Sequence, residues 1–425
     1  MPVQLPQVDW VTIAPEGILF LGGLVLLLAG VFVGRRAPRG LWSVSTLMIA
    51  LLALWPTFHL WHQINRGHAR TAIANALVID GFAVFFFVVV ISSVVLGALL
   101  ADGYLRREGL EGSEFYVLML LSASGAMLMA SANDLIVVFL GLEILSIALY
   151  ALAGYQQRRA GSQEAAIKYF VLGAFSSAFF LYGIALIYGT TGSTNLGEIA
   201  AFLRDNSLTN GMLLAGLALL LVGLGFKVAA VPFHMWTPDV YQGSPTPATA
   251  FMAAVAKAGG FAALLRIFIS AFGNNRLDWQ PIVFGLAVLS LLVGSVLAVV
   301  QTDVKRMLAY SSIAHAGYVL VGLEAATNRG VAGALFYLFA YAFMIVGSFG
   351  VVTLVSRRGD DDHSLDTYRG LAYRRPALAL TFTVFLLAQT GVPLTSGFLA
   401  KFYVIGAAVE ARSYALAIIA MVAAV

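Results

Sequence analysis

The chain has 425 residues, of which 60% are hydrophobic and 11% are charged, and its net charge is +4. Soluble globular proteins are about 45–50% apolar and about 25% charged. The mean hydropathy of +0.89 leaves too little polar surface for a water-soluble body, which excludes an ordinary cytosolic or secreted protein, a disordered chain and a coiled coil. We expect a protein whose apolar runs span a bilayer.

The sequence offers no residues for a bound cofactor. The chain has no cysteine, which excludes thiolate-ligated iron–sulfur clusters, disulfides and Cys-based zinc sites. It also has no phosphate-binding loop, no dinucleotide-binding fingerprint, no histidine pair spaced for haem and no zinc motif. We therefore expect the chain to carry neither electrons nor nucleotides, and to bind no metal and no nucleic acid.

Apolar runs of about 20 residues, long enough to cross ~30 Å of hydrocarbon as a helix, follow one another along the chain. The first ten residues contain no Lys or Arg, so the first run is predicted to be a retained span and not a signal peptide. A further run starts at Ser413 and reaches Val425, where the sequence ends within it. The twelve predicted spans lie near residues 13–34, 41–62, 77–101, 114–131, 133–154, 165–189, 212–231, 246–272, 281–300, 304–323, 331–355 and 377–411.

The positive charges favour one orientation. Loops after odd-numbered spans hold fourteen Lys and Arg residues, whereas loops after even-numbered spans hold six. Because positive loops face the cytoplasm, the N-terminus is predicted to lie on the outer, periplasmic side. The first group is Arg35, Arg36, Arg39, Arg106, Arg107, Arg158, Arg159, Lys305, Arg306, Arg357, Arg358, Arg369, Arg374 and Arg375, and the second is Arg66, Arg70, Arg204, Arg276, Arg329 and Arg412.

Two stretches of the chain resemble each other weakly. Asn133-Asp134-Leu135 opens the fifth span as Thr302-Asp303-Val304 opens the tenth, and Ile167-Lys168-Tyr169-Phe170 is similar to Leu335-Phe336-Tyr337-Leu338 at nearly the same offset. The seventh and twelfth spans are both interrupted by Gly and Pro. Since the offset is five spans, the two units must have opposite orientations, which is typical of transporters with inverted repeats.

These features predict an all-α polytopic membrane protein with about 12–14 transmembrane helices. It would contain two inverted five-helix repeats, each with a broken helix, near 226–240 and 390–396. The predicted division is an N-terminal three-helix segment (1–110), a first repeat (111–272) and a second repeat (273–425), which ends within its last helix.

A few ionisable residues fall inside spans, where an uncompensated charge is costly and usually faces a partner or a hydrated cavity. Lys257 lies about eleven residues into its span, roughly 16 Å deep at 1.5 Å per residue, and cannot reach either surface. Lys227 and Lys401 lie beside the two breaks, and we expect all three lysines to be functional. Snorkelling to the interface explains Lys168, at a span end, and Arg266 also lies toward a span end.

Glu143 and two histidines complete the candidate set, and each has two interpretations. Glu143 either holds two helices together through one buried pair or serves as a moving partner for several lysines, because one acid cannot be the permanent partner of three. In the second case the groups form a proton relay. His315 either titrates within that relay or is simply hydrogen-bonded between helices. His234 directly follows the Pro232 break and is a further candidate.

Two long motifs resemble a known family. One runs from Gly225-Phe226-Lys227 through Val231-Pro232-Phe233-His234-Met235-Trp236-Thr237-Pro238-Asp239-Val240-Tyr241 to Gly243-Ser244-Pro245-Thr246-Pro247. The other is Asp303-Val304-Lys305-Arg306-Met307-Leu308-Ala309-Tyr310-Ser311-Ser312-Ile313-Ala314-His315. Both resemble signatures of the antiporter-like membrane subunits of respiratory complex I, a family that includes the large subunits of multi-subunit cation/proton antiporters. The resemblance covers roughly residue 110 to the end.

Within this family the chain most resembles the N-type subunits of bacterial NADH–quinone oxidoreductase. The segments that indicate this are Tyr368-Arg369-Gly370-Leu371, Arg374-Arg375-Pro376 and Gly397-Phe398-Leu399-Ala400-Lys401-Phe402-Tyr403. A glutamate at the Lys401 position would suggest the M type, and the L type carries a lateral helix for which this chain is too short. The family usually has fourteen spans, and this sequence departs from it by ending within the thirteenth.

The resemblance implies roles for matching positions. Glu143 resembles a fifth-span glutamate that pairs with a lysine, and Lys227 resembles the lysine on the broken seventh span. Lys257 matches the connecting residue on the eighth span, and Lys401 the exit residue on the twelfth. The resemblance also implies NADH, FMN, iron–sulfur clusters and quinone in partner subunits. The expected partners are M-, K-, A-, J- and H-type membrane-arm subunits and lipids, in a hetero-oligomer of the bacterial inner membrane.

Three functions remain in competition at this point. The first is a cofactor-free, proton-translocating subunit of complex I, in which a Glu/Lys/His relay couples electron transfer in partner subunits to pumping. The second is a subunit of a multi-subunit cation/proton antiporter. The third is a structural scaffold, which does not explain three deep lysines.

Overall fold

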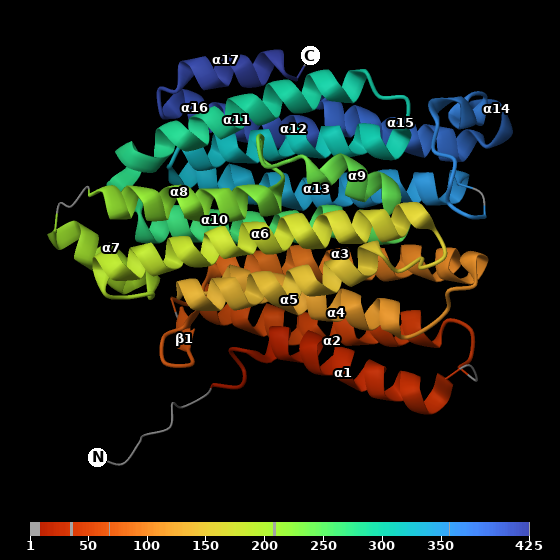
Figure 1. Ribbon diagram of the computed structural model, residues 1–425, viewed down its shortest axis with the longest axis horizontal. Coiled ribbons are helices and arrows are strands. Elements are labelled where there is room, and N and C mark those ends of the chain that lie inside the picture. Colours follow the sequence, from red (N-terminus) through yellow and green to blue (C-terminus); the bar gives the residue numbers. More distant parts are fainter. Residues whose placement is uncertain (1–8, 35–36, 68, 207–209, 357, 425) are drawn as a thin grey trace.

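The helices lie side by side along the longest axis and form one bundle (Figure 1). The computed structural model describes residues 9–34, 37–67, 69–206, 210–356 and 358–424. Of the residues that predicted the orientation, Arg35, Arg36 and Arg357 lie outside the described residues. Helix α7 lies at one end of the bundle and α14 at the other, and these ends are called the α7 end and the α14 end below.

The first part of the chain forms most of the helices that enclose the centre of the bundle. Its elements are α1 (Ala14–Val33), α2 (Leu41–Ile64), β1 (Arg70–Ala72), β2 (Leu77–Ile79), α3 (Gly81–Glu108), α4 (Glu114–Ser131), α5 (Leu135–Ala153), α6 (Ala160–Thr191), α7 (Leu196–Asp205), α8 (Gly211–Val228), α9 (Trp236–Gly243) and α10 (Thr246–Leu265).

The second part continues directly from α10 into a π-helical turn. Its elements are η2 (Arg266–Ala271), η3 (Gly273–Asn275), α11 (Arg276–Val299), α12 (Val304–Glu324), α13 (Asn328–Val355), η4 (Leu365–Tyr368), α14 (Leu371–Arg374), α15 (Pro376–Thr390), α16 (Ser396–Glu410) and α17 (Tyr414–Val422).

The all-α membrane fold is confirmed, because each predicted span coincides with a helix or a pair of helices. In the described residues, ten helices are long and apolar enough to cross a membrane, and α12 is not one of them. The third span begins at Gly81 and not near residue 77, since Leu77–Ile79 forms β2 and pairs with β1 in an antiparallel hairpin. The short helix α7 was not predicted either.

Polar caps define where several spans begin. Asp134 precedes α5 and its side chain accepts from the Ile136 amide, whereas Asp303 precedes α12 and accepts from the Arg306 amide. Such a cap satisfies one of the free amides at a helix start. Asp134 pairs in an isolated bridge with Asn195 and Asp303 with Ser364. These two matching pairs lie near α7 and near α14, at opposite ends of the bundle (Figure 1).

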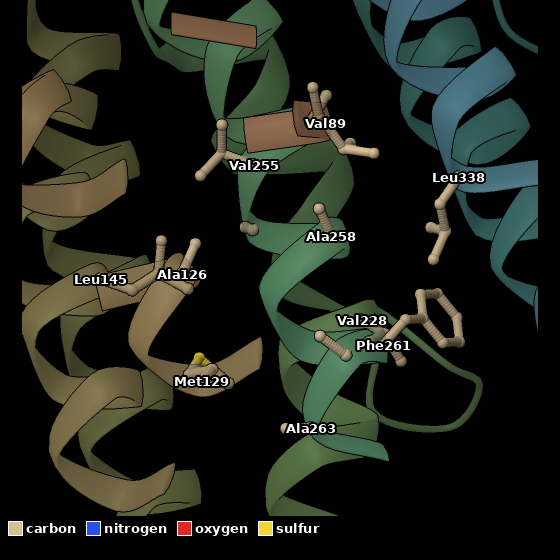
Figure 2. Close-up of a cluster of buried hydrophobic side chains, with 14 of the residues drawn as sticks. Val89, Ala126, Met129, Leu145, Val228, Val255, Ala258, Phe261, Ala263 and Leu338 are labelled. Carbon is tan, nitrogen blue, oxygen red and sulfur yellow. The ribbon is translucent and has the colours of Figure 1, made fainter. Parts of the chain in front are cut away.

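Helix α10 lies in the centre, and every one of its 20 residues is buried. Figure 2 shows its apolar side chains, with Val255, Ala258, Phe261 and Ala263 labelled, among side chains of neighbouring helices such as Leu145 and Leu338. The apolar core therefore surrounds the helix that carries Lys257, and it excludes water from most of that helix.

The two predicted breaks are confirmed. Helix α8 ends at Val228, followed by Ala229 with φ of 60°, and α9 begins at Trp236 after a cis Val231–Pro232 bond. Helix α15 ends at Thr390, followed by Gly391 with φ of 84°, and α16 begins at Ser396. In each broken helix, a residue in the left-handed conformation thus follows the first half. It turns the chain and leaves carbonyl groups without helical partners.

Candidate functional site

Lys227 lies in the last turn of α8, directly before the first break, and is only 3% exposed. Its Nζ donates to Ser146 Oγ at 2.8 Å and to the Tyr169 hydroxyl at 3.4 Å, and lies 5.5 Å from the centre of the Tyr169 ring. A Cβ atom on Gly260 would lie 2.8 Å from Val228 Cγ1. Only glycine therefore lets α10 approach the end of α8 this closely.

Glu143 lies on α5, one turn before Ser146, and its Oε1 is buried with no hydrogen-bond partner among the described residues. No salt bridge joins it to a lysine in the described part of the chain, and Lys227 donates instead to Ser146, one turn further along α5. The carboxylate is still close enough to act on the Lys227 charge. The family implies an ion pair between Glu143 and Lys227; in this structure the two charges act on each other without a direct contact.

Lys257 connects the first break to the second half of the chain. Its Nζ donates to the backbone carbonyl of Val228, the last residue of α8, at 3.3 Å, and also to the carbonyl of Ser312 on α12. The Tyr341 ring centre lies 5.7 Å from the same atom, and the Tyr341 hydroxyl donates to Ser312 Oγ at 2.7 Å. Lys257 is 3% exposed, and its two hydrogen-bond acceptors in the described chain are these backbone carbonyls.

A histidine and three tyrosines continue from there toward α16. The His315 ring lies 5.1 Å from the Tyr341 ring, and His315 Nδ1 is 2.6 Å from the Tyr337 hydroxyl. The Tyr337 ring is stacked on that of Tyr318 at 5.9 Å. The sequence predicted His315 but not the tyrosines, which occupy the positions between the ionisable groups.

Lys401 ends the series and repeats the geometry of Lys257. Its Nζ donates at 2.8 Å to the carbonyl of Thr390, the last residue of α15, and lies 4.5 Å from the centre of the Tyr318 ring. Each break therefore offers its terminal carbonyl to a buried ammonium group, and the rings add cation–π attraction. We call Lys227, Lys257, His315 and Lys401, together with Tyr169, Tyr341, Tyr337 and Tyr318, the lysine line.

The partners of the three lysines share one property: they are neutral. Lys227 binds hydroxyl groups, and Lys257 and Lys401 bind backbone carbonyls. In residues 9–424, outside the gaps given above, none of these ammonium groups forms a salt bridge with a carboxylate. Hydroxyl, carbonyl and aromatic groups can hold an ammonium ion without fixing its proton permanently, as a carboxylate would.

His234 stands apart from the line. It lies between α8 and α9, its Nδ1 is buried without a hydrogen-bond partner in the described chain, and its carbonyl accepts from the Thr237 amide. None of the contacts that connect the lysine line includes it.

A polar cluster covers the α14 side of the first break. Lys168 lies 2.7 Å from both Glu164 and Asp239, and Arg306 lies 2.7 Å from Asp239. The Lys168 side chain is 40% exposed, in agreement with its predicted place at a span end. Glu164, Lys168 and Asp239 line a cavity of about 280 Å³ together with Gln242.

Lys305 corrects the sequence analysis, which counted it in a loop. It lies in the first turn of α12 and is fully buried, 3.8 Å from the equally buried Asp360. Asp360 also contacts His363 at 3.0 Å, Arg159 at 3.5 Å and the Thr246 hydroxyl at 2.8 Å. We call these five residues the Asp360 cluster. Although burial raises the pKa of the Asp360 carboxyl, Lys305 and His363 lower it more, and the net pKa lies well below its ordinary value.

The residues that sequence analysis missed had a weak signal. The internal similarity aligns Tyr169 with Tyr337 in sequence, and Ser312 lies inside the second motif. However, a tyrosine is counted among the hydrophobic residues, and no pattern in the sequence indicated that the four tyrosines of the lysine line would lie beside buried charged groups. Among the described residues, no group of His, Asp and Glu could hold a metal ion.

Comparison with known proteins places the chain in one family. The family described as "NADH:quinone oxidoreductase/Mrp antiporter, TM" matches residues 132–425. NADH-quinone oxidoreductase subunit N of Trichlorobacter lovleyi is 46% identical over 408 residues, which cover 96% of this chain and 82% of that protein. Subunit N 1 of Solibacter usitatus is 44% identical and covers 97% and 83%.

Solved structures agree with these relatives. A chain of respiratory complex I from Thermus thermophilus with bound aureothin has a TM-score of 0.80 at 36% identity, over 96% of this chain and 86% of that one. The archaeal membrane-bound sulfane sulfur reductase gives 0.85 at 28% identity, over 96% and 85%. The Mrp complex from Dietzia sp. gives 0.84 at 23% identity, over 96% and 77%, and at that identity shares the fold alone.

Proposed function

The chain belongs to the NADH-quinone oxidoreductase subunit N family, and from this premise we propose that it translocates protons as a membrane subunit of respiratory complex I. Electron transfer would take place in partner subunits, which would hold NADH, FMN, iron–sulfur clusters and quinone. This chain would bind none of these and would act in a hetero-oligomer with the other membrane-arm subunits in the bacterial inner membrane.

The observation that carries the proposal is the lysine line itself. It connects two helix breaks through groups that are buried and can each donate or accept a proton. Buried lysines whose acceptors are neutral pass between charged and uncharged states more readily than lysines with a fixed carboxylate partner. A structural scaffold does not require buried groups that can change their charge.

The relay we propose begins at Glu143. A change in the charge of Glu143, or in a neighbouring subunit's acid, would alter the state of Lys227, and Lys257 would pass this change across to α12. His315 and the tyrosines would then connect Lys257 to Lys401. His234 stays a candidate for delivering a proton to the first break, and only its position between α8 and α9 supports this role.

The cavity beside Asp239 suits the uptake side of this relay. It lies toward the α14 end, which carries most of the positive loops and which we therefore propose to face the cytoplasm. The matching bridges at Asp134 and Asp303, at opposite ends of the bundle, support our proposal that residues 111–272 and 273–425 are inverted repeats beside an N-terminal segment, 1–110.

The test is NADH-driven proton uptake by inverted membrane vesicles that contain the whole complex. Lys227→Ala and Glu143→Ala should each lower uptake by about tenfold or more, because a positioned proton carrier contributes about 10²-fold or more to its step. Arg204→Ala removes a surface cation of α7 that lies outside the relay and the cavity, so it is the control and should leave uptake near the normal rate. Normal proton uptake and normal quinone reduction in both test variants would contradict the proposal.

The alternative function, a cation/proton antiporter subunit, is separated by the same vesicles. Complex I function requires that proton movement depend on NADH. Proton movement that depends on sodium and proceeds without NADH would favour the antiporter.

A further inference from the structure

Two carboxyl groups at the α7 end are buried and lie outside the lysine line. Glu16 on α1 and Glu324 on α12 are 8% and 5% exposed. Ser131 donates to Glu16 Oε1 at 2.9 Å, and Ser413 donates to Glu324 Oε1 at 3.0 Å. The other oxygen, Oε2, is buried in both residues and has no hydrogen-bond partner among the described residues. A half-satisfied buried carboxyl group is costly, so its presence needs an explanation.

Glu324 shares its helix with the last part of the lysine line. Helix α12 carries His315, then Tyr318 beside the Lys401 ammonium, and then Glu324 in its final turn. Glu324 follows Tyr318 by six positions, which is about 9 Å along a helix. The residues between them, 319–323, are Val, Leu, Val, Gly and Leu. Glu324 is therefore the next ionisable group on α12 after the line ends.

Helix α17 follows the same stretch of α12. The Tyr318 hydroxyl donates to the Ala420 carbonyl at 3.0 Å, and Ser413, just before α17, donates to Glu324. A seam between the two helices thus runs from the end of the lysine line to Glu324. Polar contacts stand at both ends of this seam and apolar residues lie between them.

Glu324 also lies where the interior meets the surface of the bundle. The Gln280 side chain donates to the Glu324 carbonyl at 2.6 Å, and both Gln280 and Ser413 are partly exposed. A carboxyl group in this place can exchange its proton with water, while its own side chain stays inside.

We propose that Glu324 is the release group that takes protons from the end of the lysine line and passes them to water at the α7 end. The proton leaves the Lys401 ammonium for water molecules that enter the seam, these pass it to the Glu324 carboxylate, which becomes a carboxylic acid, and a water molecule at the surface then receives it. No electron moves in these steps. The proposal rests on the proposed function.

Glu16 provides a matched control because it is equally buried and equally half-satisfied at the same end. Its serine lies on α4, and its hydrogen bond leads to no member of the lysine line. If any buried carboxyl group at this end sufficed, Glu16→Gln and Glu324→Gln would have the same effect.

The experiment measures NADH-driven proton pumping by the whole complex in liposomes. Glu324→Gln keeps the shape and removes the exchangeable proton, so pumping should fall by about tenfold or more, as for loss of a positioned proton carrier. Glu324→Asp should retain most of the pumping, and Glu16→Gln should pump normally. Ser413→Ala removes only the hydrogen bond and should also pump normally. If the amide does not assemble, Glu324→Leu takes its place, with the same loss expected.

Three results would overturn the release role: normal pumping in Glu324→Gln, an equal loss in Glu16→Gln, or an equal loss in Ser413→Ala, which would make the carboxyl group an anchor for α17. Lys227→Ala in the same series separates this failure from failure of the proposed function. If Lys227→Ala stops pumping and Glu324→Gln does not, only the release role is wrong. If neither variant affects pumping, the proposed function is wrong as well.

Discussion

Two groups of buried cations in this chain differ in whether a carboxylate lies near them. In the lysine line, Lys227, Lys257 and Lys401 bind hydroxyl and carbonyl oxygens and lie against aromatic rings. In the Asp360 cluster, Lys305 is just as deeply buried and also donates to a backbone carbonyl, that of Ser244 at 2.6 Å, but it lies in addition 3.8 Å from a carboxylate that further donors hold in place.

The difference separates two uses of a buried charge. A lysine with a carboxylate partner stays charged and ties elements together, and here the cluster joins α10 and α12 to the loop after α13. A lysine with neutral partners has nothing to hold its proton permanently. Burial alone therefore does not distinguish a functional lysine from a structural one. A buried lysine without a nearby carboxylate is the better candidate for a functional role.

The largest expected effect is on the cluster. Asp360→Ala leaves Lys305 buried without its counter-charge, and this should destabilise the subunit by about 3–5 kcal/mol. The measurement is the amount of assembled complex and its melting temperature. The double variant Lys305→Met/Asp360→Leu removes both charges and should recover much of the loss. An Asp360→Ala complex that assembles and melts normally would contradict the structural role.

A smaller effect is expected inside the lysine line. Tyr337→Phe removes the hydroxyl group that lies 2.6 Å from His315 Nδ1. Because a buried hydrogen bond is worth about 1 kcal/mol, pumping should slow by about fivefold while the melting temperature changes little. Tyr403→Phe, on the exposed side of α16, is the control and should pump normally. Equal rates in the two variants would remove His315 and Tyr337 from the relay.

The smallest effect concerns pH. The folded pKa of Asp360 lies below its unfolded value, so its stabilising contribution is complete above the unfolded pKa and is lost only as the pH falls through the folded pKa. The difference in melting temperature between the wild type and Asp360→Asn should therefore be constant from about pH 5 to pH 8. A difference that shrinks as the pH falls within this range would show that the cluster is not fixed in its charged form.

The sequence predicted the spans, both breaks and the three deep lysines, because apolar length, proline and isolated charges are local signals. It could not place Lys305, since a lysine one residue after a helix start looks the same whether a loop folds over it or solvent surrounds it. The loop that buries it, with Asp360, follows 55 residues later in the chain. The tyrosines of the lysine line are likewise assembled from α6, α12 and α13, and no local pattern shows that they meet.

If lysines without a carboxylate partner carry protons, Lys257→Met should lower pumping strongly while the complex still assembles. Methionine keeps the length and the apolar stem of the side chain; it leaves the Val228 carbonyl without its donor, which costs about 1–3 kcal/mol, while removal of the buried charge offsets part of that cost. The measurement is the rate of NADH-driven proton pumping by the purified complex in liposomes, beside its melting temperature. We predict an assembled complex whose melting temperature falls by a few degrees at most and whose pumping is lowered by about tenfold or more. A Lys257→Met complex that pumps at the wild-type rate would contradict the account.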